Sequence, residues 1–208
     1  MTFAITFAEG SVLVTLARRA ISEYITTNRV LSIPASVSAP LFQKCGVFVT
    51  LNILHQNQKE LRGCIGHPYP HTPLVEATID AAIASAFRDP RFMPVRPEEI
   101  RNLVIEVSVL TPPTRILVET PRDYVSAIKI GRDGLLVERG LSKGLLLPQV
   151  PVEWGWDAEE FLSQCCMKAG LTPDMWLVEG TKVYNFSCLV FYEKQPNGEI
   201  AVIDMRQD

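Results

Sequence analysis

The sequence lacks an excess of basic residues, since 20 lysines and arginines stand against 23 aspartates and glutamates, for a net charge of −3 with histidine neutral. Proteins dedicated to binding duplex nucleic acid usually carry a basic surplus that neutralises phosphates. The chain also has no long Lys/Arg cluster and no strip of aromatic and basic residues typical of an RNA-binding sheet. The composition therefore disfavours nucleic acid as a partner.

Long apolar runs are absent as well, and none is long enough to cross a membrane, so we expect no membrane partner. Residues 1–5 have neither the basic region nor the cleavage site of a signal peptide, which predicts a cytoplasmic location. The cysteines are odd in number and form neither a CxxC pair nor a zinc-like spacing with histidine, so we expect free thiols and no metal or other cofactor. They are Cys45, Cys64, Cys165, Cys166 and Cys188.

Apolar residues, by contrast, make up 47% of the 208 positions, which is enough to bury the core of one domain or of two small subdomains. Helical spacing of apolar residues, together with capping and stop signals, predicts helices over 11–28, 72–87 and 157–169. β-Branched residues and alternation predict strands over 46–54 and 104–110. Because these elements do not follow a βαβ rhythm, we predict an α+β fold with a mainly antiparallel sheet and flanking helices.

Glycine-containing turns separate short strand-like runs between Pro112 and Pro151. This stretch predicts a smaller β-rich lobe at about 112–156. The larger subdomain would comprise about 1–111 plus 157–208 and would end in a strand over 183–193. The 208 residues would then form a single domain with two subdomains.

The most distinctive motif is the run from Leu61 to Gly66, which is expected to form a hairpin with strand 46–54. Period-two alternation would turn Leu61, Gly63 and Ile65 toward the core, and Arg62, Cys64 and Gly66 to the other face. A guanidinium beside a thiol favours the thiolate, and glycines clear space for an approaching ligand. The motif therefore predicts a site with Cys64 as nucleophile or redox-active thiolate and Arg62 in support.

Each of these residues also has a structural interpretation. Cys64 could be a small buried apolar residue, and Arg62 could form a salt bridge with Glu106 or Asp89. Asp89 and Arg91 could line the site or hold a helix end, and Glu106 could line it or belong to a solvated strand face. His67 and His71 with Cys64 would suit a metal or a base, but without a nearby carboxylate they are a weak ligand set.

The same motif resembles the six-residue signature of the AMMECR1 domain family, and the proline-rich stretch that follows it resembles archaeal members. The resemblance spans nearly the whole chain, with its blocks in the same order. Besides the motif, the blocks are 87–95, 106–110, 144–150 and 160–171.

The resemblance implies an α+β fold of two subdomains, with the motif near a cleft between them and no settled activity. We expect Gly63, Gly66, Asp89, Arg91, Glu106 and Gln149 to line a ligand-binding cleft. Suggested roles in the family range from regulatory or nucleic-acid-linked functions to partnership with Memo-type and radical-SAM proteins.

Three hypotheses follow. In the first, the chain is a cytosolic binding or adaptor module that uses the Arg62–Gly66 cleft for an unknown small molecule or protein partner. In the second, it is an enzyme or enzyme component that acts on a small molecule through the Cys64 thiolate, with a general base still to be found. The third, a nucleic-acid-linked regulatory role, is opposed by the charge balance.

Overall fold

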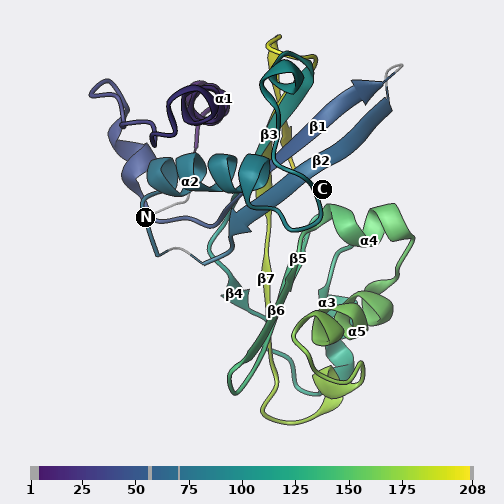
Figure 1. Ribbon diagram of the computed structural model, residues 1–208. Coiled ribbons are helices and arrows are strands. Elements are labelled where there is room, and N and C mark those ends of the chain that lie inside the picture. The colour runs from purple at the N-terminus through teal and green to yellow at the C-terminus, as the bar shows by residue number, and fades with distance from the viewer. Residues whose placement is uncertain (1–4, 56–57, 70, 207–208) are drawn as a thin grey trace. The chain divides into compact units, whose positions relative to one another are not determined.

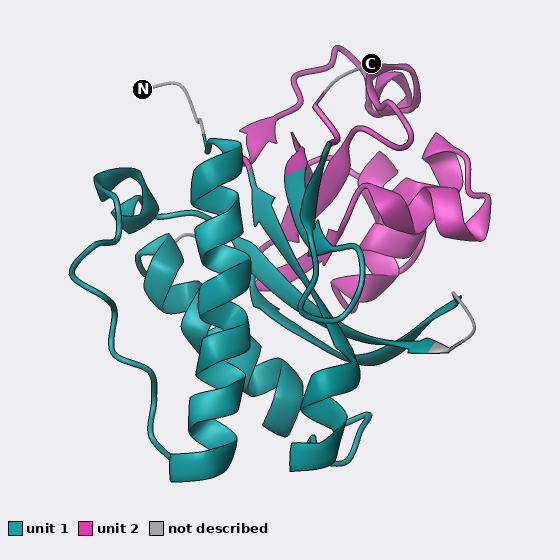
Figure 2. Cartoon of the chain, turned by 90° about the horizontal axis from the view of Figure 1, so that it is seen from above, with its two compact units in different colours: residues 1–110, 189–203 teal, residues 111–188, 204–208 magenta. Residues whose placement is uncertain are grey.

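The computed structural model describes residues 5–55, 58–69 and 71–206, which form two sheets with flanking helices (Figure 1). Contacts within the chain divide it into two compact units, coloured separately in Figure 2. Unit 1 comprises Met1–Leu110 and Leu189–Ile203, and unit 2 comprises Thr111–Cys188 and Asp204–Asp208. The strand pairings described below are antiparallel, so the predicted α+β fold is confirmed.

The larger sheet has the strand order β2-β1-β3-β8-β9. β1 pairs with both β2 and β3, so the predicted hairpin is present, although its turn at 56–57 lies outside the described residues. The strands are β1 (Val47–His55), β2 (Gln58–His67), β3 (Leu103–Leu110), β8 (Cys188–Glu193) and β9 (Ile200–Asp204).

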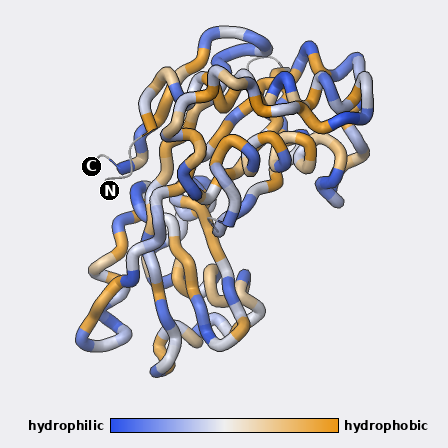
Figure 3. Tube along the Cα trace, turned by 90° about the vertical axis from the view of Figure 1, so that its left-hand side faces the viewer, coloured by the Kyte–Doolittle hydropathy of each residue, from blue (hydrophilic) through white to orange (hydrophobic). Residues whose placement is uncertain are grey.

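Alternation along β1 sends Val47, Val49 and Leu51 to one face of this sheet, where all three are fully buried. The two long helices of unit 1 pack there, because their apolar residues belong to the same core cluster. In Figure 3 the hydrophobic stretches, in orange, run mostly through the inner parts of the trace, and many outer turns are blue. The helices of unit 1 are α1 (Phe7–Thr27), α2 (Leu74–Phe87) and the short 3₁₀ helices η1 (Ala39–Phe42) and η2 (Pro97–Asn102).

Helix α1 begins four residues before the predicted cap. Thr6 is the N-cap, since its hydroxyl accepts from the Glu9 backbone N–H while the Glu9 carboxylate accepts from the Thr6 backbone N–H. Ser11, the predicted cap, instead donates its hydroxyl to the Phe7 carbonyl inside the helix.

Unit 2 holds a four-stranded sheet with the order β4-β7-β5-β6. Helix α5 packs on β5 and β6 and buries Cys165 and Cys166 in the core of this unit, as their helical spacing predicts. The strands are β4 (Thr114–Arg115), β5 (Gly134–Arg139), β6 (Ser142–Leu146) and β7 (Lys182–Phe186). The helices are η3 (Pro121–Asp123), α3 (Tyr124–Ala127), α4 (Gln149–Trp154), α5 (Ala158–Lys168) and η4 (Met175–Leu177).

The predicted division of the chain requires a correction. The single strand expected over 183–193 is two strands, β7 in the sheet of unit 2 and β8 in the sheet of unit 1. Residues 157–188 therefore belong to unit 2 and not to the larger subdomain, because α5 packs on β5 and β6 and β7 pairs with β5.

Among the described helices, none combines the length and the apolar character needed to cross a bilayer.

Candidate functional site

Cys64 lies on β2, the edge strand of the larger sheet, and is in line with one residue on each of the next two strands, β1 and β3. It pairs in register with Thr50 of β1, and Thr50 pairs in turn with Glu106 of β3. Residues in register across neighbouring strands point to the same side of the sheet. This face is opposite to the one that carries Val49 and Leu51 and receives the helices. We call Cys64, Thr50 and Glu106 the Cys64 row.

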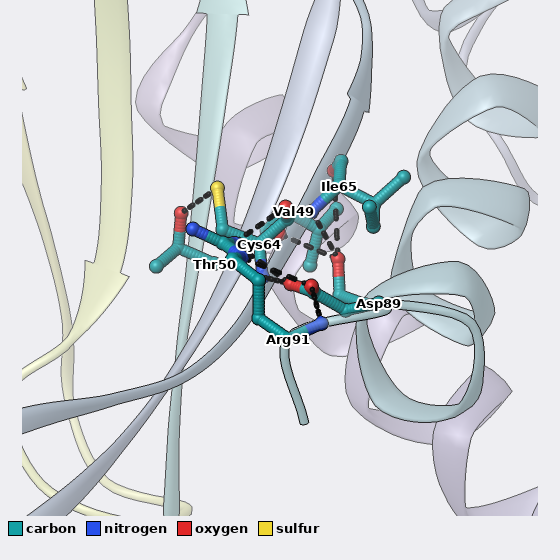
Figure 4. A network of polar contacts seen from close by, with 7 residues as sticks. Val49, Thr50, Cys64, Ile65, Asp89 and Arg91 are labelled. Atoms are coloured by element: carbon teal, nitrogen blue, oxygen red, sulfur yellow. Dashed lines mark hydrogen bonds and ion pairs between the residues drawn. The ribbon is translucent and has the colours of Figure 1, made fainter. Parts of the chain in front are cut away.

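The backbone of Cys64 is held by the turn that follows α2 (Figure 4). Its N–H donates to Asp89 Oδ2 at 2.8 Å, and Arg91 Nη2 donates to its carbonyl oxygen at 3.2 Å. Asp89 also accepts from the Arg91 backbone N–H, Nε and Nη2, at 2.8–3.1 Å. These contacts satisfy backbone groups that an edge strand would otherwise expose.

The Asp89 carboxylate is the centre of this arrangement, since its side chain is only 1% exposed. Hydrogen bonds from the Arg91 side chain are the main reason that the pKa of Asp89 lies well below its ordinary range. Burial opposes this shift, and the N–H groups of Cys64 and Arg91 reinforce it. Asp89 therefore acts as a fixed anion that joins the end of α2 to the motif.

The Cys64 thiol does not have the properties expected of an activated nucleophile. Burial raises its pKa, and the nearby carboxylates Glu106 and Asp89 raise it further. The Thr50 hydroxyl, which donates to Cys64 Sγ at 3.2 Å, and the Arg91 guanidinium both lower the pKa but do not outweigh burial. The balance of these effects disfavours the thiolate. Cys64 is nevertheless partly exposed, whereas the other four cysteines are buried.

Arg62 does not support the thiol in the way its spacing suggested. A bulge interrupts the ladder at this point, because Leu51 pairs with Gly63 and Asn52 pairs with Leu61, which leaves Arg62 between them. Its guanidinium instead pairs with Glu99 of η2, Nε to Oε1 at 2.8 Å and Nη2 to Oε2 at 3.2 Å. This pair is the main reason that the pKa of Glu99 falls to about 2.

The space that a side chain would need at the two glycines of the motif is filled by other parts of the protein. A Cβ on Gly63 would lie 2.1 Å from the Ser85 carbonyl oxygen of α2. A Cβ on Gly66 would lie 2.4 Å from the Phe48 ring and from the Val47 carbonyl oxygen. Both positions therefore need glycine for close packing.

Ser85 explains why α2 must approach this closely. Its hydroxyl accepts from the Ile65 N–H at 2.8 Å and donates to the Val49 carbonyl at 2.7 Å, so it bridges β2 and β1. Sequence reasoning missed Ser85, because a serine inside an alanine-rich helix gives no signal until the helix is placed on the sheet.

The remaining predicted residues fall in different places. Ser108, beside Glu106 on the same strand, is only 1% exposed, so this part of β3 is not a solvated face. Gln149 is the first residue of α4 and lies in unit 2, whereas the other predicted site residues belong to unit 1. Within the described part of the chain, its buried Oε1 has no hydrogen-bond partner.

His67 has a carboxylate partner that the sequence did not reveal. Its Nε2 lies 2.8 Å from Asp80 Oδ2, and Arg88 binds the other oxygen of Asp80. His67, His71, Asp80 and Glu76 line a pocket of about 340 Å³ beside α2. Across the described residues, no three His, Cys, Asp or Glu side chains are grouped to hold a metal ion.

Fold and site together define a class: an α+β protein in which a cysteine on an edge strand, flanked by glycines that pack against the protein, is held by the turn after a helix. The profile of the AMMECR1 family matches residues 14–191, and the chain belongs to the AMMECR1 family. The resemblance seen in the sequence is thus confirmed.

The chain is similar in sequence to proteins from several archaea. The chain is 57% identical to protein PH0010 of Pyrococcus horikoshii over 201 residues, covering 96% of this chain and 97% of that protein. It is 50% identical to protein MJ0810 of Methanocaldococcus jannaschii over 196 residues, covering 94% and 96%. The crystal structure of PH0010, an uncharacterized protein, matches with a TM-score of 0.89 at 55% identity and covers 96% of this chain and 98% of that one.

Proposed function

We propose that this chain is a binding module that recognises a protein partner on the face of unit 1 formed by the Cys64 row. The state of Cys64 carries the proposal. Its N–H, its carbonyl and its sulfur are already bonded to Asp89, Arg91 and Thr50, respectively. A thiol whose thiolate form is disfavoured, on a strand held in this way, suits a preorganised contact surface better than a nucleophile.

The Cys64 row places a thiol, a hydroxyl and a carboxylate in one line across three strands. Such a surface fits a partner that presents hydrogen-bond donors and small apolar groups. The family resemblance makes Memo-type and radical-SAM proteins the candidate partners. We take a Memo-type protein as the first to test.

Alkylation of Cys64 tests the proposal. N-ethylmaleimide at alkaline pH should modify Cys64 ahead of the four buried cysteines and add bulk to the contact face. Modification is counted by peptide mass, and the protein is then titrated at neutral pH with the Memo-type protein of the same genome in a calorimeter. The alkylated chain should bind at least about tenfold more weakly than the untreated chain.

Cys64→Ser is the matched control, because serine preserves the small polar contact and resists alkylation. It should bind the partner like the wild type, both before and after treatment. Equal binding by the alkylated wild type would remove the Cys64 row as the recognition surface. No binding by the untreated wild type would overturn the choice of partner.

A second candidate function rests on the partial exposure of Cys64. An enzyme component that uses a Cys64 thiolate would need an accessible sulfur, and Cys64 is the one cysteine of the five that is not buried. The same Cys64→Ser variant separates the two functions. An enzyme would lose turnover with this variant while its melting temperature stays unchanged, whereas a binding module would keep its affinity.

A further inference from the structure

Unit 2 carries a pair of stacked tryptophans at the end of α4. The rings of Trp154 and Trp156 lie 6.1 Å apart between centroids and are inclined by 17°. Gly155 between them adopts a left-handed conformation, with φ of 66°, and ends the helix. Trp156 packs against the core of unit 2, while Trp154 is 70% exposed.

The packing of unit 2 does not account for the exposed ring of Trp154. A tryptophan is the largest apolar side chain, and leaving most of it in water forfeits the free energy that burial would give. Val152, on the same short helix, is also 58% exposed, so the surface extends beyond one ring. Exposed apolar groups of this kind with a polar rim are typical of interaction sites.

The sequence on both sides of the two tryptophans is acidic. Glu153 precedes Trp154 directly, and Asp157, Glu159 and Glu160 follow Trp156 at the start of α5, all of them exposed. Between residues 144 and 167 the sequence has these four carboxylates and no lysine, arginine or histidine. Gly131 lies near Val152, and the residue after it is basic. This residue, Arg132, is ion-paired with Asp133 at 2.8 Å.

We propose that Trp154 and Trp156, together with these neighbouring carboxylates, form a docking surface for a basic segment of a partner protein, with an arginine stacked on the exposed ring. Tryptophan is the aromatic side chain that attracts cations most strongly, and guanidinium stacks on aromatic faces. The four carboxylates add attraction to a cationic chain. Nucleobases also stack on tryptophan, but the same carboxylates repel phosphates. This surface is independent of the Cys64 row.

Intrinsic fluorescence can test the surface with a hexa-arginine peptide as the probe. The chain has three tryptophans, and the third, Trp176, is only 3% exposed, so changes in emission report on the stacked pair. The peptide should quench the emission saturably, and the effect should weaken as salt is raised. Trp154→Phe should reduce the affinity about threefold, and Trp154→Ala at least about tenfold, measured by calorimetry.

Two further variants separate the ring from the charge. Glu153→Gln with Glu159→Gln should weaken peptide binding several-fold at low salt and less at high salt. Leu141→Ala, which removes a fully exposed apolar side chain elsewhere in unit 2, should leave the affinity unchanged. Equal affinity for wild type and Trp154→Ala at the same melting temperature would overturn the proposal. So would tighter binding of an oligothymidine strand than of hexa-arginine.

Discussion

The Cys64 row in unit 1 and the tryptophan pair in unit 2 use their distinctive residues in opposite ways. Around Cys64, the glycines, Asp89, Arg91 and Arg62 are all engaged with other parts of the protein. Around Trp154, a large apolar ring is left in water beside exposed sequence neighbours of one charge. A conspicuous motif can thus owe most of its residues to folding, while a less conspicuous segment keeps surface free for binding.

The largest effect is expected at Gly63. Gly63→Ala would push a methyl group against the Ser85 backbone carbonyl, which cannot move without shifting α2 from the sheet. We expect a loss of about 3 kcal/mol in the free energy of unfolding, measured by urea denaturation. Leu141→Ala is the surface control, with a change within about 0.5 kcal/mol. A Gly63→Ala chain as stable as the wild type would return this glycine to the role of ligand access and break the comparison.

A smaller loss is expected at Asp89. Asp89→Asn removes a buried charge that binds the Arg91 side chain and the Cys64 N–H, and should cost about 2 kcal/mol at neutral pH. The folded pKa of Asp89 is depressed by the Arg91 hydrogen bonds, so its contribution is present above about pH 4 and is lost as pH falls through the folded value. The wild type should therefore lose its advantage over Asp89→Asn on acidification. A pH-independent difference between the two would contradict the ionised role of Asp89.

The Arg62–Glu99 pair should contribute less, because both side chains are more exposed than Asp89. Glu99→Gln should lower the free energy of unfolding by about 1 kcal/mol at pH 7. With a folded pKa of about 2 against 4.5, caused mainly by Arg62, this contribution is full above about pH 4.5 and fades as pH falls toward 2. A double-mutant cycle with Arg62→Gln isolates the pair, and a coupling energy near zero would show that Arg62 is held by something else.

The smallest effect on stability is expected at Trp154. Trp154→Ala removes an exposed ring, so the free energy of unfolding should change by no more than about 0.5 kcal/mol. The same variant is the one expected to lose the basic peptide, which sharpens the contrast with Gly63. A loss of several kcal/mol in thermal or urea unfolding would mean that Trp154 serves the fold after all.

Sequence patterns were sufficient for much of the fold. Helix 72–87 and strand 104–110 were predicted to within two residues, because each has a clear period and a stop signal. The segment 183–193 was not, since only Ser187 separates β7 from β8, and a single serine is too weak a signal that the chain changes sheets there. The division into two units was misplaced because the packing of α5 on β5 and β6 and the pairing of β7 with β5 are not visible in the sequence pattern.

The candidate site was located by the sequence but misinterpreted in part. The motif indicated a strand with a cysteine, and Asp89 and Arg91 do lie beside it. The bulge at Arg62 could not be foreseen, because it depends on the register with β1. The raised pKa of the thiol results from burial, a property of the packed structure that period-two alternation does not report.

Ser85 has one more consequence for this protein. Because its hydroxyl joins the Ile65 amide to the Val49 carbonyl, β1, β2 and α2 share a hydrogen-bond chain that no two of them complete alone. Opening the hairpin therefore requires α2 to withdraw, and the three elements should behave as one cooperative unit in native-state hydrogen exchange. The Ile65 amide should exchange at the rate of the protected amides of α2, and Ser85→Ala should make it exchange faster than those amides.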